Sequence, residues 1–169
     1  MKVSLLFLFL VLITISCHKN NSSQSGCNIQ EVISDNSKKV TIANGIWGTV
    51  SSMEGNCMPT VPPSTNTCKN CPVQRTLKIY QYATQSDVIT NDPYKIFFDS
   101  CTTLFVAQVN ADQNGFFQID IPPGHYSIFI VENGKLYANS LDGQGGLSPF
   151  VFTTGKLNIN LTMTYKAVF

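Results

Sequence analysis

The sequence predicts an all-β fold, a single antiparallel β-sandwich of about seven strands. Short runs of β-branched and aromatic residues recur from residue 40 onward, and clusters of Gly, Pro, Asn and Asp separate them. No stretch carries a sustained period of 3.6 residues, which an amphipathic helix would produce. The chain has 169 residues, of which 43% are hydrophobic, so its length suits one domain with a proper core.

The predicted strands are short apolar runs with turn residues at both ends. In chain order they cover a first strand region at residues 39–43 and 45–51, followed by 74–82, 102–109, 116–121, 125–131, 149–153 and 157–164. Residues 94–98 are either a short edge strand or the lead into the next strand. Asn114-Gly115 and the run 132–135 are typical of hairpin turns. The alternating residues that we expect in the core are Leu104, Val106, Ile119, Ile121, Tyr126, Ile128, Ile130, Ile159 and Leu161.

Residues 1–16 are predicted to be a targeting segment that lies outside the fold. After a short positive start, residues 3–15 are almost wholly apolar. This run is too short for a permanent membrane span, which needs about 20 residues, and it matches the hydrophobic region of a secretory signal. Ser16 then precedes Cys17, and a small residue before a cysteine at this place resembles the lipobox of bacterial lipoproteins. Thr14 stands where the usual lipobox has Leu.

The lipobox resemblance implies that Cys17 receives a diacylglyceryl group and that the signal peptide is cut off directly before it. The membrane would then be reached through lipidated Cys17, since two or three acyl chains anchor a protein stably. We expect a cell-envelope protein, anchored in a bacterial membrane that we take to be the outer one, with its domain outside the cytoplasm. The alternative is an ordinary signal peptide cut nearby, which would release a soluble protein.

Residues 17–39 are expected to be a lipid-anchored flexible tether, followed by the sandwich domain at residues 40–169. Residues 18–26 contain no apolar side chain that could enter a core, and their composition is typical of a flexible spacer. The formal net charge of the chain is only +1, and no basic stripe is present. We therefore expect no nucleic-acid partner.

Six cysteines in an exported chain predict disulfides, because the compartment outside the cytoplasm is oxidising. With Cys17 assigned to lipid, Cys27 in or near the tether is the residue expected to stay unpaired. The disulfide candidates are Cys57, Cys68, Cys71 and Cys101. A bridge from Cys57 to Cys68 or Cys71 would close the loop between the first two strands, which is worth roughly 3 kcal/mol.

The spacing of Cys68 and Cys71 also occurs in zinc sites and in redox pairs. A zinc site would need two further ligands, and the chain holds only two histidines, His18 and His125. A redox pair would begin a helix, whereas these residues precede a predicted strand. We therefore favour disulfides over both of these interpretations.

Few residues suggest catalysis or metal binding. His125 and Ser127 lie two apart on a predicted strand, but no Gly-x-Ser-x-Gly elbow accompanies them. Asp112, Asn114 and the loop 142–146 offer oxygen ligands, but the calcium-loop pattern with its closing Glu is absent. We expect no catalytic residue, no metal and no cofactor.

The order of turns and strands in residues 45–169 matches a known kind of sandwich. Residues 45–50 supply an opening strand and residues 72–80 a second one. Residues 112–119 and 122–128 then give a turn, a short strand, a Pro-Gly turn and a strand that begins with Tyr. This pattern resembles the carboxypeptidase regulatory-like, or transthyretin-like, β-sandwich domain of many bacterial envelope proteins.

The resemblance implies an accessory role and no reaction of its own. We expect a non-enzymatic envelope lipoprotein whose β-sandwich is a binding or structural accessory module, with an envelope protein or a glycan as its partner. One alternative is a carbohydrate-binding module of an envelope glycan-handling system. Its stacking aromatics would come from Trp47, Tyr80, Tyr82, Tyr94 and Tyr137. The second alternative is a small envelope hydrolase that uses His125.

Overall fold

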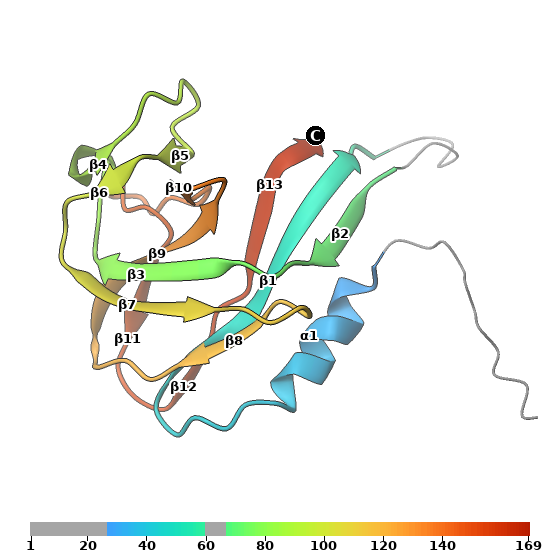
Figure 1. The fold of residues 1–169 in the computed structure, drawn as a ribbon, viewed down its shortest axis with the longest axis horizontal. Helices are drawn as coiled ribbons and strands as arrows, with labels where there is room; N and C mark the ends of the chain where they lie inside the picture. Colours follow the sequence, from blue (N-terminus) through green and yellow to red (C-terminus); the bar gives the residue numbers. More distant parts are fainter. Residues whose placement is uncertain (1–26, 60–66) are drawn as a thin grey trace, which may run out of the picture.

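Two β-sheets packed face to face make up the domain in the computed structural model, which describes residues 27–59 and 67–169 (Figure 1). The all-β prediction is confirmed. The elements in chain order are α1 (Ile29–Ser37), β1 (Gly45–Asn56), β2 (Lys69–Pro72), β3 (Thr76–Gln81), a 3₁₀ turn (Gln85–Asp87), β4 (Val88–Ile89), β5 (Phe97–Phe98), β6 (Ser100–Cys101), β7 (Phe105–Asn110), β8 (Phe116–Ile119), β9 (Gly124–Glu132), β10 (Lys135–Tyr137), β11 (Pro149–Phe152), β12 (Lys156–Asn158) and β13 (Leu161–Val168).

The first sheet is built around the long strand β1. Its first half pairs with β12 and β8, and its second half pairs with β13 and β2. The second sheet runs in the order β5-β10-β9-β3-β7, with β11 beside the first half of β9. Strands β4 and β6 form a separate small pair outside the two sheets.

The prediction of a purely antiparallel sandwich is wrong at one place. Strand β1 pairs in parallel with β12 and with β13, while every other pairing between the named strands is antiparallel. The first and last strands of the domain therefore lie side by side, and the whole second sheet forms the crossover between them. Parallel neighbours need a long connection, and local turn signals in the sequence carry no information about such a pairing.

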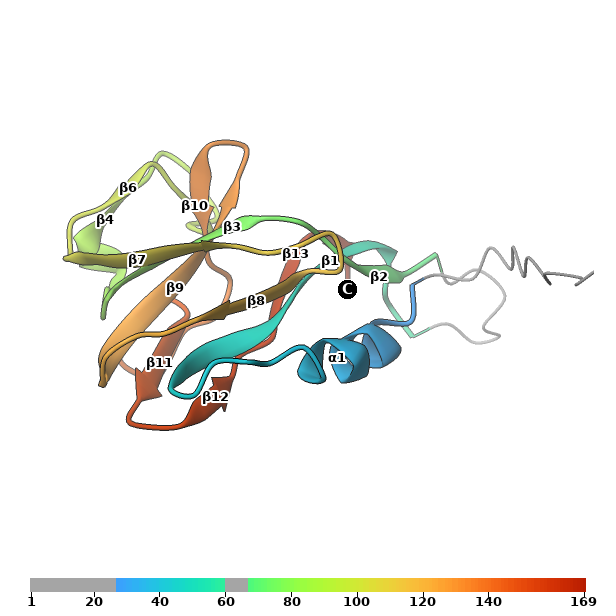
Figure 2. The same ribbon diagram turned by 60° about the horizontal axis from the view of Figure 1, so that its bottom comes forward.

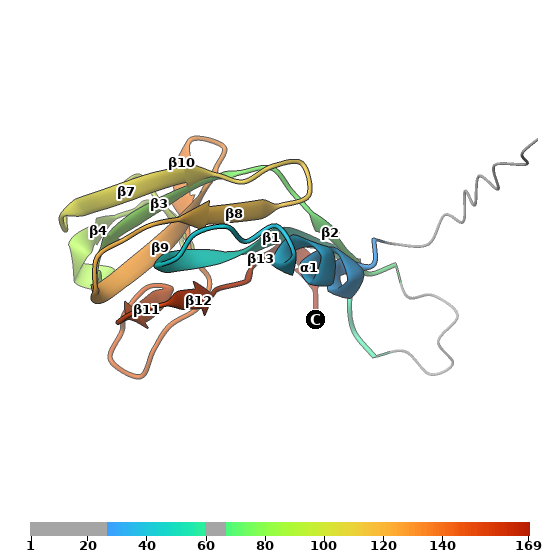
Figure 3. The same cartoon turned by 90° about the horizontal axis from the view of Figure 1, so that it is seen from below.

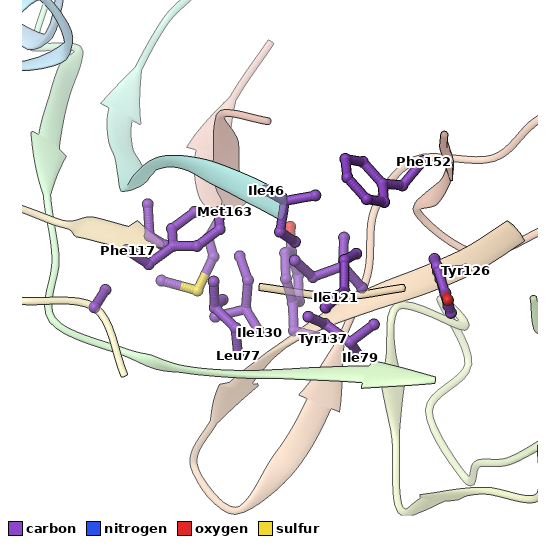
Figure 4. Close-up of a cluster of buried hydrophobic side chains, with 13 residues drawn as sticks. Ile46, Leu77, Ile79, Phe117, Ile121, Tyr126, Ile130, Tyr137, Phe152 and Met163 are labelled. Carbon is purple, nitrogen blue, oxygen red and sulfur yellow. The ribbon is translucent and has the colours of Figure 1, made fainter. Parts of the chain in front are cut away.

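The main core lies between the two sheets (Figure 4). Ile46, Val50 and Met163 enter it from the first sheet, and Leu77 and Ile79 enter it from β3. Of the predicted core residues, those that are buried are Ile121, Tyr126, Ile128 and Ile130. Those that are half-buried and pack against the core are Val106, Ile119, Ile159 and Leu161.

Leu104 is the predicted core residue that the structure contradicts, because 64% of it is exposed. It precedes the first residue of β7, so its side chain is not held between the two sheets. The alternation of the following strand therefore cannot be extended backward to it. Only its carbonyl is used, as the acceptor for the backbone N–H of Gln81.

A second, smaller core covers the outer face of the second sheet. The segment between β3 and β7 folds back over this face, and Phe98 packs there against Phe129 of β9. Leu136 and Leu147 complete the same cluster. Strand β9 is therefore buried on both faces, which explains its nearly continuous apolar sequence.

Residues 27–39 of the predicted tether are part of the folded domain, so the prediction of a flexible segment is wrong there. Helix α1 lies against β1 and β2 (Figures 2 and 3). Asn36 is buried, and its amide nitrogen donates to the Thr49 hydroxyl and to the Asn114 carbonyl, both at 2.9 Å. Lys39 adds an ion pair with Asp112 at 3.1 Å. Residues 17–26 of that tether lie outside the described residues.

The two predicted hairpin turns have different outcomes. Asn133 and Gly134 have φ values of 52° and 79° and join β9 to β10 as a two-residue hairpin, which confirms the prediction. The turn before Gly115 instead carries the chain from β7 in the second sheet to β8 in the first. The Asp112 carboxylate holds that turn by accepting from the backbone N–H groups of Asn114 and Phe116.

Candidate functional site

The cysteines form two disulfides among the described residues, Cys57–Cys68 and Cys27–Cys71. The first is one of the two bridges expected to close the loop after β1. The second overturns the expectation that Cys27 stays unpaired, and Cys101 is free rather than bridged. The reason is α1, which brings Cys27 to β2, whereas Cys101 lies on β6 on the far side of the second sheet.

His125 and Ser127 do not form the pair that the hydrolase alternative requires. Ser127 is fully buried, and its hydroxyl accepts from the backbone N–H of Ala83 and donates to the Ala83 carbonyl. The exposed His125 ring stacks on Tyr82 with 4.1 Å between ring centroids. The Tyr82 hydroxyl donates to Asp142 at 2.9 Å, so these three side chains form a separate surface cluster.

The oxygen ligands considered for calcium serve the backbone of their own turns. Asp142 accepts from the backbone N–H groups of Gln144 and Gly146, and these bonds hold the pKa of its carboxyl below the ordinary value. Asp112 does the same in its turn. In the ranges 27–59 and 67–169, no three His, Cys, Asp or Glu side chains gather as metal ligands.

A groove lined with aromatic rings is one of several concave surfaces of the domain. It consists of two adjoining hollows of about 380 and 480 Å³ that share Asp92, Phe97 and Tyr165. We call it the aromatic groove, and its lining residues are Asn91, Asp92, Tyr94, Ile96, Phe97, Glu132, Asn133, Lys135 and Tyr165. They come from the loop before β5, the β9–β10 hairpin and the end of β13.

Three packed aromatic side chains form the floor of the groove and its support. Phe97 lies 5.1 Å from Tyr165 and 5.1 Å from Tyr137, measured between ring centroids. Tyr137 is buried beneath them, and its hydroxyl accepts from the backbone N–H of Thr164. Tyr94 stands at the rim with 81% of the residue exposed, the highest exposure among the large hydrophobic residues described.

A buried carboxylate fixes one wall of the groove. Glu132 is 4% exposed, and its carboxylate accepts from the Arg75 guanidinium and, at 2.6 Å, from the Tyr165 hydroxyl. Burial alone would raise the pKa of Glu132, but the hydrogen bonds from Arg75 and Tyr165 hold that pKa below its ordinary value. Burial and the neighbouring carboxylate raise the pKa of Tyr165, so its hydroxyl stays protonated as a donor.

A second carboxylate organises the loop that carries Tyr94. Asp92 accepts from the backbone N–H groups of Ile96 and Phe97 at 3.0 Å each, and from that of Tyr94 at 3.3 Å. These bonds hold the pKa of Asp92 below its ordinary value. On the hairpin side, the Lys135 ammonium pairs with Asp99 at 2.9 Å.

The sequence predicts only part of this groove. Tyr94 and Tyr137 were among the five aromatics expected to supply a stacking surface, and the structure brings both to this place. Trp47, Tyr80 and Tyr82 are half-buried elsewhere, so the five do not form one platform. Phe97 lies in the predicted segment 94–98, and Tyr165 directly follows the predicted strand 157–164. No local signal indicates that these two segments meet, so the sequence does not single out either residue.

The predicted lipidation site Cys17, the signal peptide at residues 1–16 and His18 lie outside the described residues. No helix in the described part of the chain is long and apolar enough to cross a membrane. In comparisons with known proteins, no family model, no curated protein and no solved structure matches this chain.

Proposed function

We propose that this chain is a non-enzymatic lipoprotein of a bacterial cell envelope, anchored in the outer membrane through Cys17, whose β-sandwich is a binding module outside the cytoplasm. The observation that carries the proposal is the pair of disulfides, Cys27–Cys71 and Cys57–Cys68. Disulfides persist in exported proteins and are rare in the cytoplasm. They therefore agree with the apolar leader and the lipobox-like residues that precede the domain.

The Cys27–Cys71 bridge also limits how far the domain can stand from the anchor. Cys27 follows Cys17 by ten residues, and ten residues span at most about 35 Å when fully extended. A flexible tether that ended at residue 39, as the sequence predicts, would allow more than twice that reach. Cys27, and with it the end of the domain that carries the Cys27–Cys71 bridge, therefore lies within about 35 Å of the anchor.

A binding role agrees with the chemistry of the aromatic groove. Two of its charged side chains are in ion pairs, Glu132 with Arg75 and Lys135 with Asp99. The third, Asp92, accepts hydrogen bonds from three backbone N–H groups. Such contacts shape a wall and leave no unpartnered charge from these groups to act as a base or a nucleophile. The carboxypeptidase regulatory-like resemblance points the same way, because that kind of domain accompanies other proteins rather than carrying out a reaction.

The anchor is tested by membrane fractionation of the full chain, expressed with its leader in a bacterium that lipidates exported proteins. We expect wild type in the membrane fraction and the Cys17→Ser variant in the soluble extracytoplasmic fraction, because the variant lacks the thiol that takes the lipid. Cys101→Ser is the matched control, since it removes a free thiol from the domain, and it should stay with the membrane. Membrane association that survives Cys17→Ser refutes the lipid anchor.

A further inference from the structure

We propose that the aromatic groove binds an uncharged glycan, with Tyr94 as the stacking residue. The inference rests on the proposed function, since it names the class of ligand for that binding module. Three features of the groove support it: its exposed and packed rings, its internally neutralised charges and the fixed conformation of its rim loop.

The rings suit the apolar face of a sugar ring. A pyranose presents C–H groups on its faces and hydroxyls around its edge, so it needs a flat aromatic partner and polar groups beside it. Tyr94 offers a ring that is 81% exposed, and Phe97 and Tyr165 continue the apolar surface inward. The amides of Asn91 and Asn133 line the adjoining hollow, where they can exchange hydrogen bonds with hydroxyls.

The charges of the groove favour a neutral ligand. Glu132 is neutralised by Arg75, and the Lys135 ammonium is paired with Asp99. The Asp92 carboxylate is stabilised by hydrogen bonds from three backbone N–H groups of its own loop. An anionic ligand would have to compete for Lys135, and a cationic one would have to compete for these carboxylates. An uncharged ligand meets neither cost.

The rim loop is already ordered before a ligand arrives. The Asp92 carboxylate spans Tyr94, Ile96 and Phe97, and the Thr90 hydroxyl donates to the Phe97 carbonyl at 2.5 Å. Binding therefore does not have to order the loop backbone, and only the Tyr94 side chain has to settle on the ligand. This preorganisation lowers the entropic cost of binding a ligand on a shallow aromatic surface.

The test is a binding screen of the full-length protein against neutral and acidic oligosaccharides, with calorimetry on each hit. We expect binding to at least one neutral oligosaccharide and weaker or no binding to its acidic counterparts. Tyr94→Ala should weaken binding at least about tenfold, while Tyr94→Trp should retain it. Phe169→Ala, which removes another exposed aromatic outside the groove, should leave binding unchanged.

The glycan proposal is overturned if no neutral oligosaccharide binds, if only acidic ones bind, or if Tyr94→Ala binds as well as wild type. Repeating the titration with Cys17→Ser separates this proposal from the anchor. Intact glycan binding together with membrane association of Cys17→Ser would overturn the anchor alone. Lipid-dependent membrane association without glycan binding would overturn the glycan proposal alone.

Discussion

At the scale of single residues, Glu132 shows how the sandwich uses a buried charge. Its carboxylate lies at the end of β9, where it joins Arg75 from the segment before β3 to Tyr165 on β13. It thereby links the two sheets at the aromatic groove. Removing one partner of such a pair leaves the other buried group without its hydrogen bonds, and that loss is costly.

The acid stability of the protein should reflect Glu132. The pKa of Glu132 in the folded state lies below the ordinary value of 4.5. The ionised carboxylate therefore contributes fully to the free energy of unfolding above pH 4.5, and this contribution is lost as the pH falls through the folded-state pKa. We expect Glu132→Gln to lose about 2 kcal/mol of unfolding free energy at pH 7 and to show a shallower decline between pH 5 and pH 3. Urea denaturation at several pH values measures both effects.

Asp120→Asn is the control for that measurement, because Asp120 is exposed and its substitution removes the same charge as Glu132→Gln. It should retain the stability and the acid decline of wild type. An acid decline in Glu132→Gln as steep as in wild type would show that other carboxylates account for the whole effect.

The identity of the site residues could be predicted only where the signal was local. Tyr94 is one of the five aromatic residues that the sequence offers for a stacking surface, and the structure places it at the rim of the groove. Glu132 was noted only as part of a hairpin turn. Its role depends on Arg75 and Tyr165, which lie 57 and 33 residues away in the chain, and no pattern in the sequence indicates that such distant residues meet.

At the scale of elements, the sequence predicts the longer strands but misses the helix and the short strands β2, β4, β6 and β10. Residues 39–43, predicted as part of the first strand region, form no strand, and β1 begins only at Gly45. Each long strand carries β-branched and aromatic residues between turn residues, so local pattern and final structure agree. Helix α1 has nine residues, too few for a sustained period. The available signal was its start, where the Asn28 side chain accepts from the backbone N–H of Glu31 three residues later.

Two glycines with the same backbone conformation should respond differently to substitution. Gly115 and Gly155 have φ values of +70° and +78°, so alanine is strained at both. At Gly155 a Cβ atom would meet nothing within 4 Å, and Gly155→Ala should cost about 1 kcal/mol. At Gly115 the Cβ would lie 2.2 Å from the Val50 carbonyl oxygen. This clash in Gly115→Ala can be relieved only if β1 moves.

We therefore expect Gly115→Ala to cost clearly more, about 3 kcal/mol or above. Thermal denaturation of the two variants beside wild type measures the difference. Equal losses would mean that β1 yields at this point, and the close approach of the β7–β8 turn to β1 would then not constrain the fold.

At the scale of the whole molecule, the disulfides attach the N-terminal segment to the sandwich. Cys27 and Cys71 are 44 residues apart in the chain, whereas Cys57 and Cys68 are 11 apart. In the chain-entropy model the longer closed segment gives the larger stabilisation, about 4 kcal/mol against about 3 kcal/mol. The bridge to Cys27 also keeps α1 on the first sheet.

The two bridges can be compared by removing each as a pair. We expect the Cys27→Ser/Cys71→Ser variant to lose about 1 kcal/mol more stability than Cys57→Ser/Cys68→Ser, with Cys101→Ser close to wild type. Guanidinium denaturation without reductant measures all three. A larger loss from Cys57→Ser/Cys68→Ser would contradict the role assigned to Cys27 as the main covalent fastening of the domain.

The pairing of β1 with β12 and β13 is likewise a property of the whole molecule. It joins the beginning and the end of the domain, about 110 residues apart in the chain. Local sequence signals predicted the strands themselves but could not say which ones would be neighbours. The same limit applies to the aromatic groove, whose walls come from three distant segments.

The proposed membrane anchor depends on a lipid at Cys17, and mass spectrometry of the mature protein purified from bacterial membranes tests it most directly. We predict a chain that begins at Cys17 and carries a diacylglyceryl group on its sulfur together with an acyl chain on its amino terminus. A mature protein without acyl chains, or one that begins elsewhere, would contradict the membrane-anchored module.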